Sequence, residues 1–487
     1  MQQQLENPTE KQEKDDVQKM AEFTEHVLSN SVVKRMLRFC TKKCRCGRRI
    51  DLILKDYSGD KQKLCTRCKI AKFMILQVLT SFARRSKISE KDVKLALKDN
   101  IWRKGLCTVL EGLAVYGPKK PFTSYAPFLI VWNITKKCNL ACKHCYENAH
   151  IPDKDELTTE EALQAVDKMA DAGVAYIAIS GGEPLSRPDF FQVAKHIIDR
   201  EMGFSIATNA TLMTKETAKK LKEMGCSYAQ ISLDGAKAET HDSFRGRNVF
   251  TKTLEGIKNA VDEGIIIGLA MTVTKFNLDE VPDVIDLAEK LGVAIFMHYN
   301  FIPVGRGTEI IDMDLTPQER ETLLKYLSSQ VGKRKVAILS TAPQFAPICA
   351  QQGCPAASMT HFDTIGQMPE FGSSVQFLAE FVGGCGTGRL YCALEPNGDI
   401  EPCVFIPIIV GNIKKDDLVD VWQKNETLKK LRDRENFKGR CSACENRNIC
   451  GGCRARAYGY YKDVQQSDPG CILNVDEWEK LKAVAKK

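Results

Sequence analysis

The sequence predicts an α/β protein built around a mostly parallel sheet. From residue 128 onward, short apolar and β-branched runs alternate six times with amphipathic helical runs. The links between these runs are short, so successive strands should lie parallel and be joined by right-handed crossovers. Segments dense in cysteine flank this alternating region on both sides, which predicts additional metal-binding modules at the two ends of the chain.

Hydrophobic periodicity locates the expected elements. The strands are expected at 128–135, 174–180, 204–208, 228–233, 266–272 and 294–299. The helices are expected at 158–172, 188–201, 215–224, 251–263, 279–291 and 316–331. In parallel α/β folds, ligands bind at the carboxyl ends of the strands, so we expect the functional site at that edge.

The composition of the chain is that of a soluble globular protein with several domains. Its 487 residues are 43% hydrophobic and 27% charged. No apolar run approaches the roughly 18–20 residues that a membrane helix needs, and the amino terminus does not resemble a signal peptide. Twenty cysteines without such a signal predict a cytoplasmic, reducing location, where thiols bind metals instead of forming disulfides.

The positive charge is concentrated near the amino terminus. Residues 31–127 contain 24 Lys and Arg against 7 Asp and Glu, a local charge of +17 within a chain of net charge +8. Such a region indicates an anionic partner, which would be nucleic acid, an acidic substrate or a phospholipid surface at the inner face of the membrane. The alternative is a solvated basic surface.

The same region contains two close pairs of cysteines, Cys44 with Cys46 and Cys65 with Cys68. Residues 50–60 between them are expected to form a short hairpin. Four thiols at the ends of a hairpin predict a tetrahedral Zn²⁺ or mononuclear iron site, with Cys40 as a spare ligand. The alternatives are a further iron–sulfur cluster and free thiols.

Residues 71–115 are predicted to be helical, with Ser89 capping the second helix, and 117–121 form a linker rich in Gly and Pro. The apolar stripes of these helices are flanked by Lys and Arg. We expect them to pack in a core, with contact to a membrane surface as the alternative.

A second cysteine motif follows the first expected strand. Cys138, Cys142 and Cys145 have the spacing C-x3-C-x2-C. A [4Fe–4S] cluster normally takes four protein thiolates, so a loop that offers three leaves one iron free for another ligand. Zinc is the alternative, although zinc sites usually use four protein ligands.

This motif resembles that of the radical S-adenosylmethionine enzymes. The resemblance implies a partial (β/α)6 barrel at 128–340, in which the fourth iron binds the amino and carboxylate groups of S-adenosylmethionine. It implies reductive cleavage to a 5′-deoxyadenosyl radical that abstracts hydrogen from a substrate. A low-potential electron donor such as ferredoxin or flavodoxin would be needed, and no side chain need act as a catalytic base.

The expected strand ends carry further matches to this family. After the second strand come Gly181, Gly182 and Glu183, which resemble the segment that receives the methionine amino group. After the third strand, Asn209 lies in a segment that resembles the family's T-N-G, with Ala210 in place of glycine.

Three more matches involve the nucleoside and the carboxylate. Ser232 and Asp234 resemble the strand end that hydrogen-bonds the ribose, and Arg245 would meet the carboxylate in bidentate fashion. His144 occupies the position where the family places a ring against adenine. Matches at four successive strand ends are hard to obtain by chance.

Two later segments are expected near the mouth of the barrel. The loop 300–307 resembles that of enzymes acting on tetrapyrrole side chains or peptides, so Arg306 would hold a phosphate or carboxylate or else be solvated. Residues 341–384, which include Cys349 and Cys354, are irregular and are expected to form an insertion or substrate lid.

The carboxyl-terminal cysteines, in 385–487, resemble the SPASM extension of the same family. The resemblance implies two auxiliary [4Fe–4S] clusters, one on Cys385, Cys392, Cys403 and Cys453 and the other on Cys441, Cys444, Cys450 and Cys471. The gap between Cys450 and Cys453 has two residues, one fewer than in the family's run C-x2-C-x5-C-x3-C. A zinc ribbon is the alternative. Fully ligated clusters favour electron transfer over substrate binding.

The sequence therefore predicts a radical S-adenosylmethionine oxidoreductase with three [4Fe–4S] clusters, preceded by a polar tail at 1–30 and the basic cysteine module at 31–127. Peptide or protein modification is the preferred activity. The alternatives are modification of a heme-type tetrapyrrole side chain and carbon–carbon coupling of lipid chains at a membrane surface. A different class, a zinc-dependent nucleic-acid-binding protein, is the disfavoured alternative.

Overall fold

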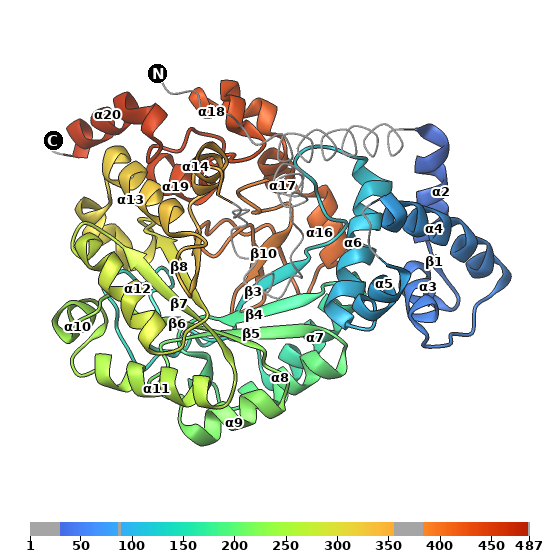
Figure 1. Ribbon diagram of the computed structural model, residues 1–487, viewed down its shortest axis with the longest axis horizontal. Helices are drawn as coiled ribbons and strands as arrows, with labels where there is room; N and C mark the ends of the chain where they lie inside the picture. The colour runs from blue at the N-terminus through green and yellow to red at the C-terminus, as the bar shows by residue number, and fades with distance from the viewer. Residues whose placement is uncertain (1–29, 86–88, 355–382, 486–487) are drawn as a thin grey trace.

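One twisted sheet runs through the computed structural model, which describes residues 30–85, 89–354 and 383–485 (Figure 1). Within these ranges its strand order is β12-β11-β10-β3-β4-β5-β6-β7-β8-β9. Neighbouring strands from β10 through β3 to β9 are parallel, whereas β10, β11 and β12 are antiparallel. The strands are β3 (Leu129–Asn133), β4 (Tyr176–Ser180), β5 (Gly203–Thr208), β6 (Tyr228–Ser232), β7 (Ile266–Val273), β8 (Ile295–Asn300), β9 (Ala337–Ser340), β10 (Tyr391–Leu394), β11 (Asp399–Glu401) and β12 (Gly411–Asn412).

Helices alternate with the parallel strands, as the sequence predicted, and cover the outer face of the curved sheet (Figure 1). Thr158 and Thr316 begin two of them with capping boxes, each formed with a glutamate three residues on. The helices of this layer are α7 (Thr159–Ala172), α8 (Phe190–Asp199), α9 (Lys215–Glu223), α10 (Ala238–Arg245), α11 (Phe250–Asp262), α12 (Val281–Lys290) and α13 (Pro317–Gln330). The expected partial barrel is confirmed, and α10 is an additional helix.

The sheet extends beyond the six expected strands at both edges. β9 pairs with β8, and β10 from the carboxyl-terminal segment pairs in parallel with β3. All four residues of β10 are buried, because its apolar side chains are covered on both faces like those of the other central strands. The sheet therefore continues across the position at which we expected a new domain to begin. The remaining helices of that segment are α16 (Leu418–Lys424), α17 (Glu426–Arg432), α18 (Arg440–Ala443), α19 (Arg454–Tyr461) and α20 (Val475–Ala485).

The amino-terminal module is helical and lies at the right-hand side of Figure 1. It comprises α2 (Ser31–Thr41), β1 (Lys43–Cys44), β2 (Gly47–Arg48), α3 (Arg49–Ser58), α4 (Thr66–Arg85), α5 (Glu90–Ala96) and α6 (Asn100–Tyr116). The hairpin expected at 50–60 was wrong, because this segment is α3. Ile50, Ile53 and Leu54 recur at helical spacing and are buried together, and Gly59 ends the helix with φ +110°. The hairpin is instead the short β1–β2 pair.

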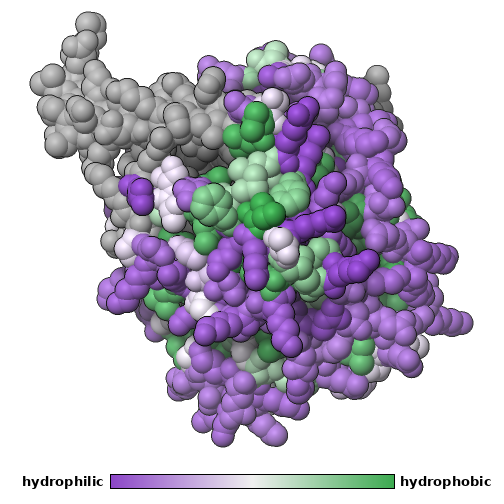
Figure 2. Space-filling model, turned by 90° about the vertical axis from the view of Figure 1, so that its right-hand side faces the viewer, coloured by the Kyte–Doolittle hydropathy of each residue, from purple (hydrophilic) through white to green (hydrophobic). Residues whose placement is uncertain are grey.

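The apolar stripes of this module divide between core and surface. Leu110 and Leu113 of α6 are buried, in agreement with a core face, whereas Ile70 and Phe73 of α4 are 52% and 68% exposed. Figure 2, which looks at this side of the molecule, shows hydrophobic side chains gathered within a hydrophilic surround. In the described ranges, no helix combines the length and the apolar character that crossing a membrane requires.

The expected insertion is described only in part. Its first residues form α14 (Phe345–Gln352), and the Sγ atoms of Cys349 and Cys354 are 2.9 Å apart. Residues 355–382, and almost all of the polar tail, lie outside the described residues, so the lid stays a prediction.

Candidate active site

A cavity opens at the carboxyl ends of the parallel strands. Side chains and backbone from the ends of β3, β4, β5, β6, β7 and β8 line it. Nine of the eleven residues expected to hold the cofactor contribute to its wall, namely Cys138, Cys142, His144, Cys145, Gly181, Gly182, Asn209, Ser232 and Arg245. The other two, Glu183 and Asp234, are fully buried behind the wall. The structure therefore brings these eleven residues together at one edge of the sheet, and their roles toward a cofactor stay a prediction.

The loop after β3 carries three cysteines at the cavity wall. In the described part of the chain, only the amino-terminal group of cysteines brings three or more ligand atoms within 4.8 Å of one another. The sulfurs of Cys138, Cys142 and Cys145 are therefore too far apart to surround one ion. Thiolates of a cubane bind different irons and are held farther apart than those around one ion, so the arrangement is compatible with an iron–sulfur cluster. Burial raises the pKa of Cys138 to about 12, so its thiolate needs a bound cation.

The loop after β8 braces the cysteine loop. Arg306 donates from Nε to the carbonyl oxygen of Cys142 at 2.8 Å and from Nη2 to that of Ala149 at 3.1 Å. Its backbone N–H donates to the carbonyl of Cys145 at 2.9 Å. Arg306 is thus bonded to protein backbone, in contrast to the solvated side chain that was one of our two expectations.

The two glycines after β4 are required by close packing of the backbone. A Cβ at Gly181 would lie 2.5 Å from the carbonyl oxygen of Thr135, and one at Gly182 would lie 2.3 Å from that of Lys137. The resemblance implied that this segment receives the methionine amino group. The two glycines do line the cavity, but the neighbour that excludes a side chain is the start of the cysteine loop.

Glu183 joins two strand ends. Its carboxylate accepts hydrogen bonds from Oγ1 of Thr208 at 2.8 Å, from the backbone N–H of Asn209 at 2.9 Å and from that of Leu185 at 3.2 Å. Burial raises the pKa of Glu183 to about 7, although these bonds oppose the shift. The carboxylate fixes the ends of β4 and β5 and lies outside the cavity wall.

Asn209 connects the third strand end to the cysteine loop. Its Nδ2 donates to Oδ1 of Asn139 at 2.9 Å, and Asn139 donates from Nδ2 to Thr211 at 2.7 Å. Ala210 adopts φ +60°, which explains why glycine is common at this position in the family. The segment after β5 is therefore hydrogen-bonded to the cysteine loop at Asn139.

Asp234, Arg245 and His144 form a buried charged group beside Cys142. Arg245 donates from Nε to Oδ2 of Asp234 at 2.6 Å, and its Nη1 lies 3.9 Å from Sγ of Cys142. Burial would raise the pKa of Asp234, but the positive charge of Arg245 outweighs it and holds the pKa at about 2. Because part of the guanidinium is already bonded to Asp234, only the remaining donors of Arg245 can face a ligand carboxylate.

His144 presents an unused polar atom at the cavity wall. Its Nε2 lies 3.3 Å from Nη2 of Arg245, whereas its buried Nδ1 has no hydrogen-bond partner among the described residues. Burial lowers the pKa of His144 to about 4, so the ring is neutral at pH 7. A buried polar atom without a partner fits a wall that receives a polar ligand.

Three of the four cysteines expected to hold the first auxiliary cluster line a second, smaller cavity. Cys385, Cys403 and Cys453 share this cavity with Asn300, Ile302 and Phe405, which also line the first one. Cys392 does not line it. In β10, Tyr391 donates to Sγ of Cys403, so Cys392, the next residue, points to the opposite, helix-covered face of the sheet.

The four cysteines of the second expected set influence one another electrostatically. Burial, followed by the charges of Asp468, Cys441 and Cys444, raises the pKa of Cys471 to about 12. Burial and the neighbouring Cys471 and Cys441 likewise raise the pKa of Cys450. Cys441, Cys444, Cys450 and Cys471 therefore lie near one another, and the cluster that the resemblance implies for them stays a prediction.

Several residues of the cavity wall were missed by the sequence analysis. Tyr146 and Phe405 come from distant segments, and their ring centroids are 4.8 Å apart. Tyr299 donates to Oε1 of Gln230 at 2.7 Å, and both line the cavity. Alternation along β6 and β8 places Gln230 and Tyr299 on the inner face, which is a signal that the sequence did contain.

Comparisons with known proteins agree with this geometry. The model of the radical SAM superfamily matches residues 132–288, and that of an iron–sulfur cluster-binding domain, SPASM, matches residues 385–446. The AdoMet-dependent heme synthase of Methanosarcina barkeri is 35% identical over 351 residues, which cover 71% of this chain and 97% of the relative. The mycofactocin maturase MftC of Mycolicibacterium smegmatis is 30% identical to this chain, and the match covers 71% of this chain and 83% of the maturase.

Solved structures show the same fold. SuiB of Streptococcus suis bound to S-adenosylmethionine superposes with a TM-score of 0.60 at 17% identity, over 83% of this chain and 90% of its own. The structure of anSMEcpe with bound AdoMet gives a TM-score of 0.54 at 19% identity, over 74% and 99% of the two chains. On the strength of the cysteine loop, the cavity and its relatives, this chain belongs to the radical SAM superfamily and is a radical SAM enzyme with a SPASM domain.

Proposed function

We propose that this enzyme uses S-adenosylmethionine to modify a side chain of a tetrapyrrole. The observation that carries this proposal is the 35% identity to an AdoMet-dependent heme synthase over 97% of that protein's length. The Fe-coproporphyrin III synthase of Methanosarcina barkeri, 31% identical over 88% of its length, gives independent support. Peptide modification was the preferred prediction from sequence, and it becomes the second candidate.

The walls of the cavity combine apolar and polar side chains, which suits a ligand such as a tetrapyrrole with an apolar ring and polar side chains. Leu129, Val131 and Ile302 give it an aliphatic surface, and Tyr146 and Phe405 add aromatic rings. Polar side chains, among them Asn300 and Gln230, also face it, beside those expected to hold the cofactor. An apolar pocket with a few placed polar groups is the usual form of a small-molecule or cofactor site.

The cofactors follow from the ligand groups already described. Cys138, Cys142 and Cys145 would hold the [4Fe–4S] cluster with S-adenosylmethionine, and this pair supplies a 5′-deoxyadenosyl radical when bound. Arg306 and Asn209 would keep the cysteine loop in place, and Arg245 would stabilise the thiolate of Cys142. The apolar wall would exclude water from the reacting carbon.

The carboxyl-terminal cysteines would hold two auxiliary clusters. Cys385, Cys403 and Cys453 would contribute to the first, and the second would use Cys441, Cys444, Cys450 and Cys471. A cluster at the second cavity would lie beside the first cavity, because Asn300, Ile302 and Phe405 line both cavities. That position suits transfer of an electron to or from the substrate. A ferredoxin or flavodoxin would reduce the enzyme.

The test uses anaerobically purified holoenzyme, S-adenosylmethionine, dithionite and Fe-coproporphyrin III as the probe. We expect formation of 5′-deoxyadenosine to rise when the porphyrin is added, and the porphyrin to change mass. Porphyrin deuterated in its side chains should transfer deuterium to 5′-deoxyadenosine. Formation at the porphyrin-free rate, with the porphyrin unchanged, would reject the tetrapyrrole assignment and leave the cleavage chemistry intact.

Peptide modification is favoured by a different observation, the 27–30% identity to mycofactocin maturases over 83–88% of their lengths. The two candidates differ in what raises the rate of 5′-deoxyadenosine formation. If a mycofactocin-type precursor peptide raises it and becomes modified while Fe-coproporphyrin III does neither, the second candidate replaces the first.

A further inference from the structure

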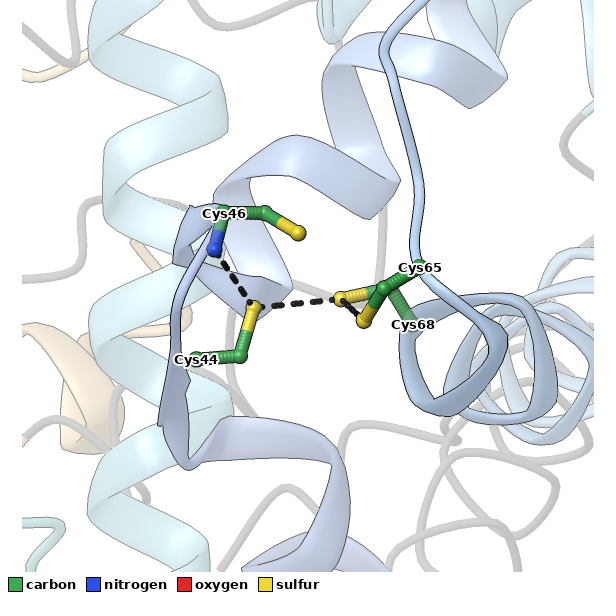
Figure 3. Close-up of side chains that lie close together, drawn as sticks. All are labelled: Cys44, Cys46, Cys65 and Cys68. Atoms are coloured by element: carbon green, nitrogen blue, oxygen red, sulfur yellow. Dashed lines mark hydrogen bonds between the residues drawn. The ribbon is translucent and has the colours of Figure 1, made fainter.

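The four cysteines of the amino-terminal module converge on one point. The ligand atoms of Cys44, Cys46, Cys65 and Cys68 all lie within 4.8 Å of one another. The Sγ atoms of Cys44 and Cys68 are 3.3 Å apart, and those of Cys65 and Cys68 are 3.5 Å apart. Figure 3 shows the first pair on the β1–β2 hairpin and the second pair at the start of α4, with their side chains turned toward each other.

This spacing is that of a single tetrahedral ion. Zn–S bonds of about 2.3 Å in a tetrahedron separate neighbouring sulfurs by about 3.8 Å. A cubane would need the sulfurs farther apart, because its thiolates bind different irons. Cys40, our expected spare ligand, is not among them, because it is buried and its S–H points to the carbonyl of Ala71 at 3.7 Å.

We propose that Cys44, Cys46, Cys65 and Cys68 bind one Zn²⁺, which fastens the β1–β2 hairpin to α4 and thereby positions Arg48 against the barrel. All four positions of the ion are filled by protein thiolates, which is the form of a structural zinc site and leaves no position for substrate. This proposal does not depend on which substrate the enzyme modifies.

The hairpin needs such a fastening. Its two strands have only two residues each, and an isolated two-stranded hairpin is marginally stable even when it is longer. Cys46 at its turn is exposed, so no packing of its side chain holds the turn in place. Small modules with short elements commonly obtain this stability from a metal ion.

What the hairpin carries is Arg48. This residue ends β2, and its Nε donates to Oε1 of Glu111 on α6 at 2.9 Å, in an ion pair in which the Glu111 side chain is 4% exposed. The guanidinium lies against Gly173, at the end of α7 in the barrel, where a Cβ would overlap it. On the same glycine, Thr108 of α6 donates to the carbonyl oxygen at 3.2 Å.

A displaced hairpin would therefore leave a buried carboxylate without its counter-charge. Removing one partner of a buried pair is strongly destabilising, because the remaining charge stays buried and unpaired. The ion would thus hold the hairpin in place, and the hairpin would position Arg48 against Glu111. The metal site would therefore stabilise the contact of the module with the barrel.

The first experiment is metal analysis of full-length holoenzyme grown with both iron and zinc. We expect one zinc per chain in addition to cluster iron. Cys68→Ser and Cys46→Ser should each lose the zinc and keep the iron. Cys40→Ser, a buried thiol of the same module, is the matched control and should keep both. Zinc retained in the Cys46→Ser/Cys68→Ser double variant would overturn the site.

The identity of the ion has its own test. Protein grown with cobalt in place of zinc should show the visible absorption bands of tetrahedral thiolate Co²⁺, and these bands should be absent in Cys68→Ser. A single extra iron per chain with the spectrum of a four-thiolate ferric ion would overturn zinc as the resident metal.

The fastening role is tested by hydrogen exchange. In Cys68→Ser we expect amide exchange of the hairpin, residues 43–48, to accelerate about tenfold or more relative to wild type. Arg48→Met should accelerate exchange at the end of α6 around Glu111 while keeping the zinc. Exchange unchanged in Cys68→Ser, despite the loss of zinc, would overturn the fastening role.

Discussion

The Nε of Arg306 donates to the carbonyl oxygen of Cys142 across 2.8 Å. The two residues are far apart in the sequence, but their loops follow β8 and β3 at the same edge of the sheet. Nη2 and the backbone N–H of Arg306 donate to two further carbonyls of the cysteine loop, those of Ala149 and Cys145. The loop that carries the cysteines is therefore held from the opposite side of the barrel.

We expect Arg306→Met to loosen the cysteine loop. It removes two side-chain donors from partly buried carbonyls, and an unsatisfied buried group costs about 1–3 kcal/mol. The rate of 5′-deoxyadenosine formation should fall by about tenfold or more, since a free-energy difference of about 1.4 kcal/mol corresponds to a factor of ten. On anaerobically reconstituted protein, iron analysis shows whether the loosened loop still holds its cluster, and product chromatography measures the rate of 5′-deoxyadenosine formation.

Arg247→Met is the matched control, because Arg247 is exposed on the loop after α10. It removes the same charge without touching the cysteines, so it should cleave S-adenosylmethionine at the wild-type rate. Arg306→Lys should recover part of the activity through one remaining donor. Equal rates for Arg306→Met and wild type would show that the brace has no role in catalysis.

Asp234→Asn should destabilise the protein. The substitution leaves Arg245 buried beside Cys142 without its counter-charge, and breaking a buried ion pair in this way typically costs about 3–5 kcal/mol. Chemical unfolding under anaerobic conditions measures the loss. Asp279→Asn, at an exposed position, is the control. The double variant Asp234→Asn/Arg245→Met removes both charges of the buried pair, so it should be more stable than Asp234→Asn alone. A double variant that is equally unstable would contradict the ion-pair explanation.

The sequence contained most of the barrel and the strand-end residues of the cavity wall. Apolar strands and amphipathic helices have strong periodicity, and short links force a parallel order, so the elements from β3 to α13, except α10, followed from local pattern. Residues at strand ends share one edge of such a sheet. For this reason Asn209, Ser232 and Arg245 could be assigned to one site without knowledge of their contacts.

What the sequence did not contain are relationships set by tertiary contacts. The helix α3 was mistaken for a hairpin, since Asp51-Leu52-Ile53-Leu54 fits both periods over so few residues. The pairing of β10 with β3 joins segments more than 250 residues apart, and no local pattern specifies such a partner. The same pairing decides which face of the strand Cys392 occupies, and spacing between cysteines carries no information about that face.

Cys392 and Cys403 are therefore expected to behave differently. Cys403 lines the second cavity with Cys385 and Cys453, whereas Cys392 points to the helix-covered face of β10. Cys403→Ala should lose about four irons, the content of one cluster. Cys392→Ala should keep its iron, because it removes only a buried thiol. Iron analysis of the two variants, purified side by side, makes the comparison, and loss of iron from Cys392→Ala would return this residue to the ligand set suggested by the family resemblance.

The last prediction concerns acid sensitivity. His298 is 1% exposed, its Nδ1 lies 2.8 Å from Oγ of Ser340, and burial together with the charges of Arg320 and Arg456 lowers its pKa to about 3. Its ordinary pKa is about 6.5. Between these values the unfolded chain binds a proton that the folded protein does not. The free energy of unfolding therefore rises with pH across this window, and the stability is fully present above about pH 6.5 and lost as the pH falls below it.

Between about pH 7.5 and about pH 5.5, this one group should lower the free energy of unfolding by about 1.4 kcal/mol. His298→Asn retains a polar contact for Ser340 but has nothing to protonate, so its stability should fall less over the same range. Comparing each protein with itself at the two pH values cancels any loss of clusters that both share. His150→Asn, which replaces an exposed histidine, should keep the wild-type difference. An identical pH dependence in wild type and His298→Asn would show that the buried imidazole does not contribute to the acid sensitivity.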